Sequence, residues 1–148
     1  MVLPDLCWDT GMAALPITDD SLLVRTHFGD QAAWQRLQAA ALGENEDGFR
    51  AYLAVVDDEA LEGASWEQLR AAVLTAAQHA SVLFIADEEA MRGSQPLQVV
   101  DLSARGRPPF RCVADQLWSV ENNLNLANMD WEEFAAAVDG QGVHRGFD

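Results

Sequence analysis

The chain has 148 residues, of which 49% are hydrophobic, and its 24 acidic and nine basic residues give a formal net charge of −15. A chain of this length buries a full core as one domain without disulfide bonds or metals, and its charge excludes nucleic acid as a partner, because that requires a basic surface. The first twenty residues lack the basic start of a signal peptide, and no apolar run approaches a membrane span. We therefore expect a soluble, cytoplasmic protein with no membrane partner.

Residues 1–18 contain Pro4 and Pro16 and are predicted to form an irregular lead-in, in which Trp8 docks on the body of the protein. Residues 19–148 then alternate between short apolar runs and helical periodicity, with no internal repeat and no interdomain linker. We therefore predict a single domain over 19–148.

The first regular elements are a strand at 22–26 ("LLVRT") and a helix at 31–42. In the helix, Trp34, Leu37 and Ala41 recur at the spacing that places them on one face. This unit therefore predicts a strand followed by an amphipathic helix.

A second strand at 52–56 ("YLAVV") precedes a helix at 66–77, whose start is marked by the capping-box spacing of Ser65 and Gln68. The run "VLFIA" at 82–86 is continuously apolar, as expected for a strand buried on both faces. This order of strands and helices predicts three parallel strands joined by crossover helices.

Two further strands, at 97–101 and 110–114, are separated only by "ARGRPP", which is too short for a helical crossover, so they are predicted to form an antiparallel hairpin. A helical region begins at "DQLWSV", a helix is expected at 131–138, and "GVHRGF" at 142–147 is a candidate edge strand. The predicted fold class is thus α/β: a single-domain mixed sheet with three parallel strands, crossover helices, an antiparallel hairpin and a C-terminal helical segment.

Two signals mark the start of the last helix. Asp130 and Glu133 have the spacing of a capping box, and Met129 and Phe134 stand at the two positions of a hydrophobic staple. We therefore expect the helix to begin here with Phe134 turned into the core.

Several segments, "LLVRT", "VVDD", "LWSVENNL" and "NMDWEEFAAAVD", resemble a family of small acidic bacterial proteins known only as a domain of unknown function. The resemblance runs from Leu22 to Phe147 and leaves the lead-in outside. It implies a bacterial protein but no particular activity, substrate or catalytic residue. The position of His27 is commonly acidic in that family, which argues against a required role for this histidine.

Acidic residues follow two of the predicted strands: Asp57 and Asp58 follow the second, and Asp87 follows the third. Carboxyl ends of parallel strands meet at the edge where α/β proteins bind ligands, so these carboxylates predict a contact surface or a site for a hard cation such as Mg²⁺. A simpler interpretation is that they cap turns and helix starts. No phosphate-binding glycine loop or metal-ligand spacing accompanies them, so we predict no metal and no cofactor.

Nucleophilic catalysis is not indicated by the remaining reactive residues. His27, His79 and His144 stand in no recognisable relation to a serine or cysteine, and His144 is expected to be exposed. Cys112 falls within the apolar strand at 110–114 and is expected to be a buried free thiol. No catalytic residue is therefore predicted.

The stretch "SVENNLNLANMDWEEF" at 119–134 combines asparagines and acidic residues with apolar ones. A break between two helices explains most of it, because amide side chains satisfy loose main-chain groups there. Its other polar side chains and the preceding tryptophan form our preferred contact surface: Trp118, Glu121, Asn122, Asn123, Asn125 and Asn128.

Together these features predict a non-catalytic, acidic protein-binding module with a basic protein partner, because a charge of −15 speeds encounters with cationic surfaces. A narrower hypothesis, from size and charge, is an immunity or inhibitor protein for a basic toxin domain. The alternative is a metal-dependent enzyme that uses the strand-end carboxylates. Solubility is a simpler explanation of the charge and remains open.

Overall fold

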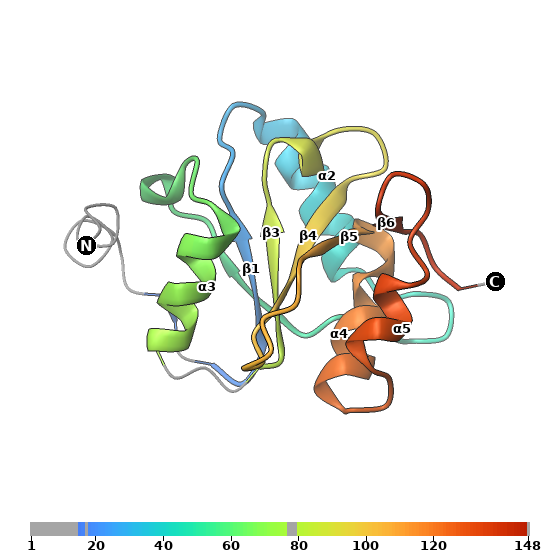
Figure 1. The fold of residues 1–148 in the computed structure, drawn as a ribbon. Helices are drawn as coiled ribbons and strands as arrows, with labels where there is room; N and C mark the ends of the chain where they lie inside the picture. The colour runs from blue at the N-terminus through green and yellow to red at the C-terminus, as the bar shows by residue number, and fades with distance from the viewer. Residues whose placement is uncertain (1–14, 17, 77–79, 148) are drawn as a thin grey trace.

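In the computed structural model, the described residues place six strands in one mixed sheet (Figure 1). The described residues are 15–16, 18–76 and 80–147, so the predictions for Trp8, for His79 and for most of the lead-in lie outside them. The strands are β1 (Ser21–Arg25), β2 (Leu53–Val56), β3 (Val82–Ala86), β4 (Pro96–Asp101), β5 (Phe110–Val113) and β6 (Val143–His144).

The strand order across the sheet is β2-β1-β3-β4-β5-β6. β1 pairs in parallel with both β2 and β3, whereas β4 is antiparallel to β3 and to β5. β6 runs parallel to β5 at the far edge. The three parallel strands, the hairpin and the edge strand that the sequence predicts are therefore confirmed.

The helices of the described residues are α2 (Gln31–Leu42), α3 (Trp66–Thr75), α4 (Leu117–Asn125) and α5 (Trp131–Ala135), with short 3-10 turns η1 (Glu59–Leu61), η2 (Glu89–Met91) and η3 (Ala114–Gln116). α2 has the predicted bounds, but α3 ends at Thr75 rather than at 77, and α5 ends at Ala135 rather than at 138. α5 ends where the Ala137 N–H donates to the carbonyl of Phe134 at 3.0 Å, a three-residue turn that breaks the helical pattern. Further on, the Asp139 carboxylate accepts the N–H groups of Gln141 and Val143 at 2.8 and 3.1 Å. The turn at Asp139 directs the chain into β6.

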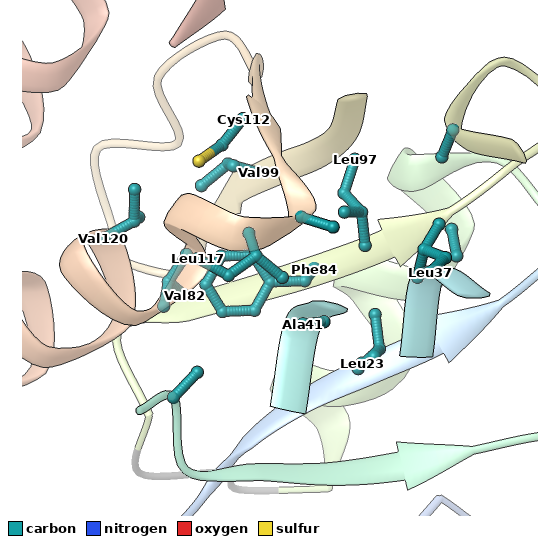
Figure 2. Close-up of a cluster of buried hydrophobic side chains, with 14 of the residues drawn as sticks. Leu23, Leu37, Ala41, Val82, Phe84, Leu97, Val99, Cys112, Leu117 and Val120 are labelled. Atoms are coloured by element: carbon teal, nitrogen blue, oxygen red, sulfur yellow. The ribbon is translucent and has the colours of Figure 1, made fainter. Parts of the chain in front are cut away.

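Successive side chains of the strands point to opposite faces of the sheet and pack into two cores, one on each face. Leu22 and Val24 of β1 belong to the core under α3, and Leu23 belongs to the larger core under α2, α4 and α5. Figure 1 shows α3 on one side of the sheet and the other three helices on the opposite side. Figure 2 shows part of the larger core, where Phe84 of β3 lies beside Leu117 of α4. The sheet is thus buried on both faces, as the run at 82–86 predicts.

Side-chain caps hold the starts of three helices. The Asp30 carboxylate accepts a first-turn N–H of α2 at 2.9 Å. Ser65 and Gln68 form the predicted capping box of α3. At α5, Glu133 Oε1 accepts the N–H of Asp130 at 3.0 Å within the second predicted capping box. These bonds satisfy N–H groups that a helix start leaves without main-chain partners.

Candidate functional site

A groove opens beside Trp118, the aromatic residue of the predicted contact surface. It has a volume of about 550 Å³ and lies between the end of α2, the loop that follows α2, and the start of α4. In Figure 1 this loop runs beside α4 on the side of the sheet opposite α3. We call this hollow the acidic groove and define it by its lining residues: Ala39, Ala40, residues 43–47, Asp115, Gln116 and Trp118.

Four exposed carboxylates line the acidic groove: Glu44, Glu46, Asp47 and Asp115. None of them forms an ion pair within the described residues, which include all nine arginines of the chain. The acids that do have arginine partners lie elsewhere. The groove therefore carries a concentration of uncompensated negative charge.

The end of α2 adds to this negative potential. Ala39 and Ala40 of its last turn line the groove, and that turn contains no basic residue. The last carbonyl groups of a helix have no main-chain partners and carry the negative end of the helix dipole. A cationic group is therefore favoured here by the helix as well as by the carboxylates.

Trp118 supplies an aromatic surface at the same place. It is half-buried, and its ring stacks on Phe49 with a centroid distance of 5.4 Å and an interplanar angle of 15°. Phe49 and the nearby Tyr52 are 51% and 53% exposed. Large exposed aromatic side chains beside charged ones are typical of protein contact surfaces.

Glu121, which the sequence assigns to the contact surface, is only 6% exposed. Its Oε1 accepts the N–H of Tyr52 and the side-chain amide of Asn122, both at 2.8 Å, and its Oε2 accepts the side-chain amide of Asn125 at 2.8 Å. This carboxylate therefore joins α4 to the start of β2 and faces inward.

The asparagines next to it continue this internal network. The Asn125 amide donates to Ser21 Oγ at 2.8 Å, and its Oδ1 accepts the N–H of Ser81 at 2.8 Å. The Asn122 amide donates to the carbonyl of Arg50 at 2.9 Å. α4 is thereby tied to the amino ends of β1 and β3 and to the segment before β2.

Asn123 and Asn128 belong to the break after α4. The Asn123 amide donates to the carbonyl of Ser119 at 2.9 Å, and its main-chain carbonyl accepts the N–H of Asn128 at 2.9 Å. Asn128 is exposed, and its side chain has no hydrogen-bond partner among the described residues. Of the predicted contact set, Trp118 and Asn128 thus remain the most available to a partner.

The strand-end carboxylates have partners of their own. Asp57 accepts from Arg25 at 3.3 Å and from the indole N–H of Trp34 at 3.2 Å. Asp87 accepts from both terminal nitrogens of Arg111, at 2.9 and 2.8 Å. These acids neutralise buried or half-buried arginines.

Asp58 accepts the N–H of Ala60 at 3.0 Å and caps η1. In the part of the chain that is described, no three His, Cys, Asp or Glu side chains are placed to share a metal ion. The strand-end acids also lie at the carboxyl edge of the sheet, whereas Asn125 binds the amino ends of β1 and β3. The structure therefore does not bring the two halves of the predicted contact surface together.

The sequence did not indicate the acidic groove, because "GENEDG" reads as an ordinary polar loop and Asp115 has no neighbouring signal. One signal was present: an acidic run directly follows a helix whose last turn has no basic residue. The position of Asp115 and Trp118 opposite that run depends on tertiary packing.

Cys112 is a buried free thiol, as predicted. Burial raises its pKa, and the negative charge of Asp115 raises it further. The thiol is therefore held protonated, which makes it a poor nucleophile.

His144 is 0% exposed, so the prediction that it is exposed is wrong. β6 pairs with β5, and the His144 ring packs edge-on against Phe134 and Phe147 at centroid distances of 5.3 and 4.8 Å. Neither ring nitrogen has a hydrogen-bond partner among the described residues. Burial lowers the pKa of His144 below its ordinary 6.5. The nearby main chain of Ala137 raises this pKa by a smaller amount.

This burial predicts a loss of stability in mild acid. As the pH falls through 6.5, His144 takes up a proton in the unfolded chain but resists it in the folded chain, so the free energy of unfolding falls. Urea titrations at about pH 7.5 and about pH 5.5 measure this loss of stability. Carboxylates titrate near pH 4, so they should contribute little to the difference between these two pH values. In His144→Leu, which cannot titrate, this part of the pH dependence should vanish. An unchanged pH dependence in that variant would contradict the burial of a neutral imidazole.

The fold and this surface define a small, single-domain α/β protein with a mixed sheet and an acidic groove at the end of one helix. Residues 20–147 match the family described as a domain of unknown function (DUF6924), and the chain belongs to that family. This match confirms the resemblance between Leu22 and Phe147. No curated protein and no solved structure matches the chain. Among the described residues, no helix combines the length and the apolar character needed to cross a bilayer.

Proposed function

We propose that the protein is a non-catalytic binding module of the bacterial cytoplasm that recognises a basic protein partner through the acidic groove. The observation that carries this proposal is the set of four carboxylates without ion-pair partners among the described residues, gathered around Trp118 at the end of α2. The net charge of −15 adds attraction at longer range.

Charge and aromatic surface have different effects on such a complex. Attraction between opposite charges mainly raises the association rate, and salt screens it. Trp118, fixed by its stack on Phe49, offers a rigid apolar surface that slows dissociation once water is excluded. An arginine or lysine of the partner would contact both the Trp118 ring and the carboxylates.

In this proposal, the charged part of the contact surface is the acidic groove rather than the predicted Asp57, Asp58 and Asp87. Two of these acids balance Arg25 and Arg111, so their removal would leave an arginine without its partner. The four groove acids balance no arginine, and their charge is available to a second molecule.

A narrower form of the proposal is that the partner is a basic enzyme or toxin domain that the protein inhibits. It is supported by the size and charge of the chain alone. Its test is whether the purified protein, added in excess, abolishes the activity of the partner.

The association rate with a partner co-purified from the native host should depend on the groove acids. Neutralising all four, with Glu44→Gln, Glu46→Gln, Asp47→Asn and Asp115→Asn, is expected to slow association about tenfold or more at low salt. The same variant should lose most of the salt dependence that the wild type shows. Stopped-flow or surface-based kinetics over a range of salt concentrations measure both effects.

A control variant changes the net charge by the same amount elsewhere: Asp19→Asn, Asp20→Asn, Glu59→Gln and Glu67→Gln, all at exposed positions. It should slow association much less, because these acids lie outside the groove. Equal slowing by the two variants would mean that only the overall charge matters. Turnover of a substrate that requires Asp57, Asp87 and a divalent metal would favour the enzyme alternative.

A further inference from the structure

A second hollow, of about 340 Å³, lies at the carboxyl edge of the sheet, where β1 and β3 end. The chain leaves β1 toward β2 and leaves β3 toward β4, which are in opposite directions along the sheet. In open α/β sheets, ligands bind at such a switch point, and small-molecule pockets have volumes of about 300–1,000 Å³. We call this feature the switch-point hollow.

The floor of the hollow is polar and lies on the sheet face that α3 covers. Thr26, Asp87 and Gln98 line it. Val24 and Ile85 belong to the core under α3. Thr26 and Asp87 each lie two residues further along the chain and therefore face the same side of the sheet. Gln98 pairs with Ile85 across β3 and β4 and therefore shares that face. Where the core under α3 ends, three polar side chains thus take its place.

The segment before α3 forms a wall held against this floor. The N–H of Gly63 donates to the carbonyl of Thr26 at 2.8 Å. Gly63 has φ +76°, a left-handed conformation that favours glycine. The half-buried Trp66, the first residue of α3, also lines the hollow. The wall therefore combines a fixed main chain with an aromatic side chain.

Thr26 is the informative residue of the hollow. It is only 4% exposed, yet its hydroxyl has no hydrogen-bond partner within the described residues. The hydroxyl oxygen itself is not fully buried, so it is open to a molecule that enters the hollow. The side chains of Gln98 and His27, which also line the hollow, have no hydrogen-bond partner among the described residues either. A ligand in the hollow would supply these missing partners.

The carboxylates around the hollow already have partners. Asp87 is bound by Arg111 at 2.8 Å, Glu88 by Arg92 at 2.8 Å, and Glu62 accepts a main-chain N–H at 3.1 Å. A cation would have to compete with Arg111 and Arg92 for Asp87 and Glu88, and the negative charge of Glu62, which has no ion-pair partner among the described residues, disfavours an anion. The side chains of Thr26 and Gln98, which carry no charge, are left to bind a ligand, so an uncharged ligand fits best.

We propose that the switch-point hollow binds a small, uncharged polyhydroxy molecule of monosaccharide size. Its hydroxyl groups pair with Thr26 and Gln98, and its less polar ring face lies against Trp66. The proposal is independent of the partner-binding function, because the hollow and the acidic groove share no lining residue.

Titration of the isotope-labelled full chain with D-glucose and with myo-inositol, followed by NMR of the amide signals, tests this site. The shifts should concentrate at Thr26, Gly63 and Gln98. Thr26→Val keeps the side-chain shape but removes the hydroxyl, and it should weaken binding about tenfold. Thr75→Val makes the same change at an exposed position of α3 outside the hollow and should leave binding unchanged.

A stability measurement distinguishes whether the Thr26 hydroxyl binds a ligand or holds the fold together. Thr26→Val should leave the midpoint of urea unfolding unchanged or raise it, because the hydroxyl has no partner to lose in the folded chain. A clear drop in that midpoint would overturn the proposal. Inorganic phosphate and putrescine serve as charged probes: localised shifts with either of them and not with the two polyols would also overturn it, as would the absence of localised shifts with both polyols.

Discussion

Replacing Phe134 with alanine is expected to lower the free energy of unfolding by about 3–5 kcal/mol, because it empties a large space in the core. Phe134 is 0% exposed and packs against α4 and the sheet. Its ring meets Phe110 at 6.4 Å, His144 at 5.3 Å and Phe147 at 5.4 Å between centroids. The change therefore loosens α5 and both C-terminal strands at once. Urea titration followed by tryptophan fluorescence measures the loss.

Two smaller changes in the same region provide the comparison. Phe147, the neighbouring aromatic, is 50% exposed, so Phe147→Ala should cost about 1–2 kcal/mol. Asp130→Ala removes the helix cap and should cost about 0.5–2 kcal/mol. Similar small losses for all three variants would show that the inward face of α5 has been assigned to the wrong residue.

Glu121→Ala is expected to be the second most damaging change, with a loss of about 3 kcal/mol or more. The carboxylate accepts three hydrogen bonds at 2.8 Å, and its removal leaves the N–H of Tyr52 and the amides of Asn122 and Asn125 without this acceptor. Glu121→Gln keeps the shape but places a donor group among donors, so it should also destabilise. The midpoint of urea unfolding measures both variants.

Glu46→Ala is the matched control, because Glu46 is exposed and has no ion-pair partner among the described residues. It should change stability by no more than about 0.5 kcal/mol. If Glu121→Ala were as mild as Glu46→Ala, Glu121 would return to the contact surface that the sequence predicts for it.

Patterns within single elements were reliable guides to the fold. The periodicity of Trp34, Leu37 and Ala41 predicts α2 with its observed bounds, and all three residues are at most 2% exposed. The short "ARGRPP" connection predicts the antiparallel pairing of β4 and β5, which is confirmed. These predictions succeed because residue spacing and loop length act through local geometry.

Burial at the C-terminal end could not be read in the same way. His144 stands in the polar segment "GVHRGF", and nothing near it in the sequence shows that β5, Phe134 and Phe147 enclose it. A two-residue strand carries no periodicity of its own. Its burial follows from pairing with a strand far along the chain.

The candidate site shows the same division. The sequence identifies Trp118 and the excess of negative charge, and it explains most of the asparagine-rich stretch as a helix break. It does not distinguish Glu121, which is buried, from the exposed acids at 44, 46 and 47. The residue type is the same in both places. Only the surrounding residues determine whether a glutamate accepts hydrogen bonds inside the protein or remains exposed to a partner.

By itself, the sequence determined the α/β class, the order of the strands along the chain, the helix starts and the acidic character of the surface. Each of these depends on residues that are close in the chain or on composition. Tertiary structure alone decided that Asp57 and Asp87 form ion pairs with Arg25 and Arg111. It also decided that Asp115 lines one groove together with the loop at 43–47, and that Thr26 lines a second hollow. These outcomes depend on contacts between distant segments, whose partners are chosen only when the whole sheet packs.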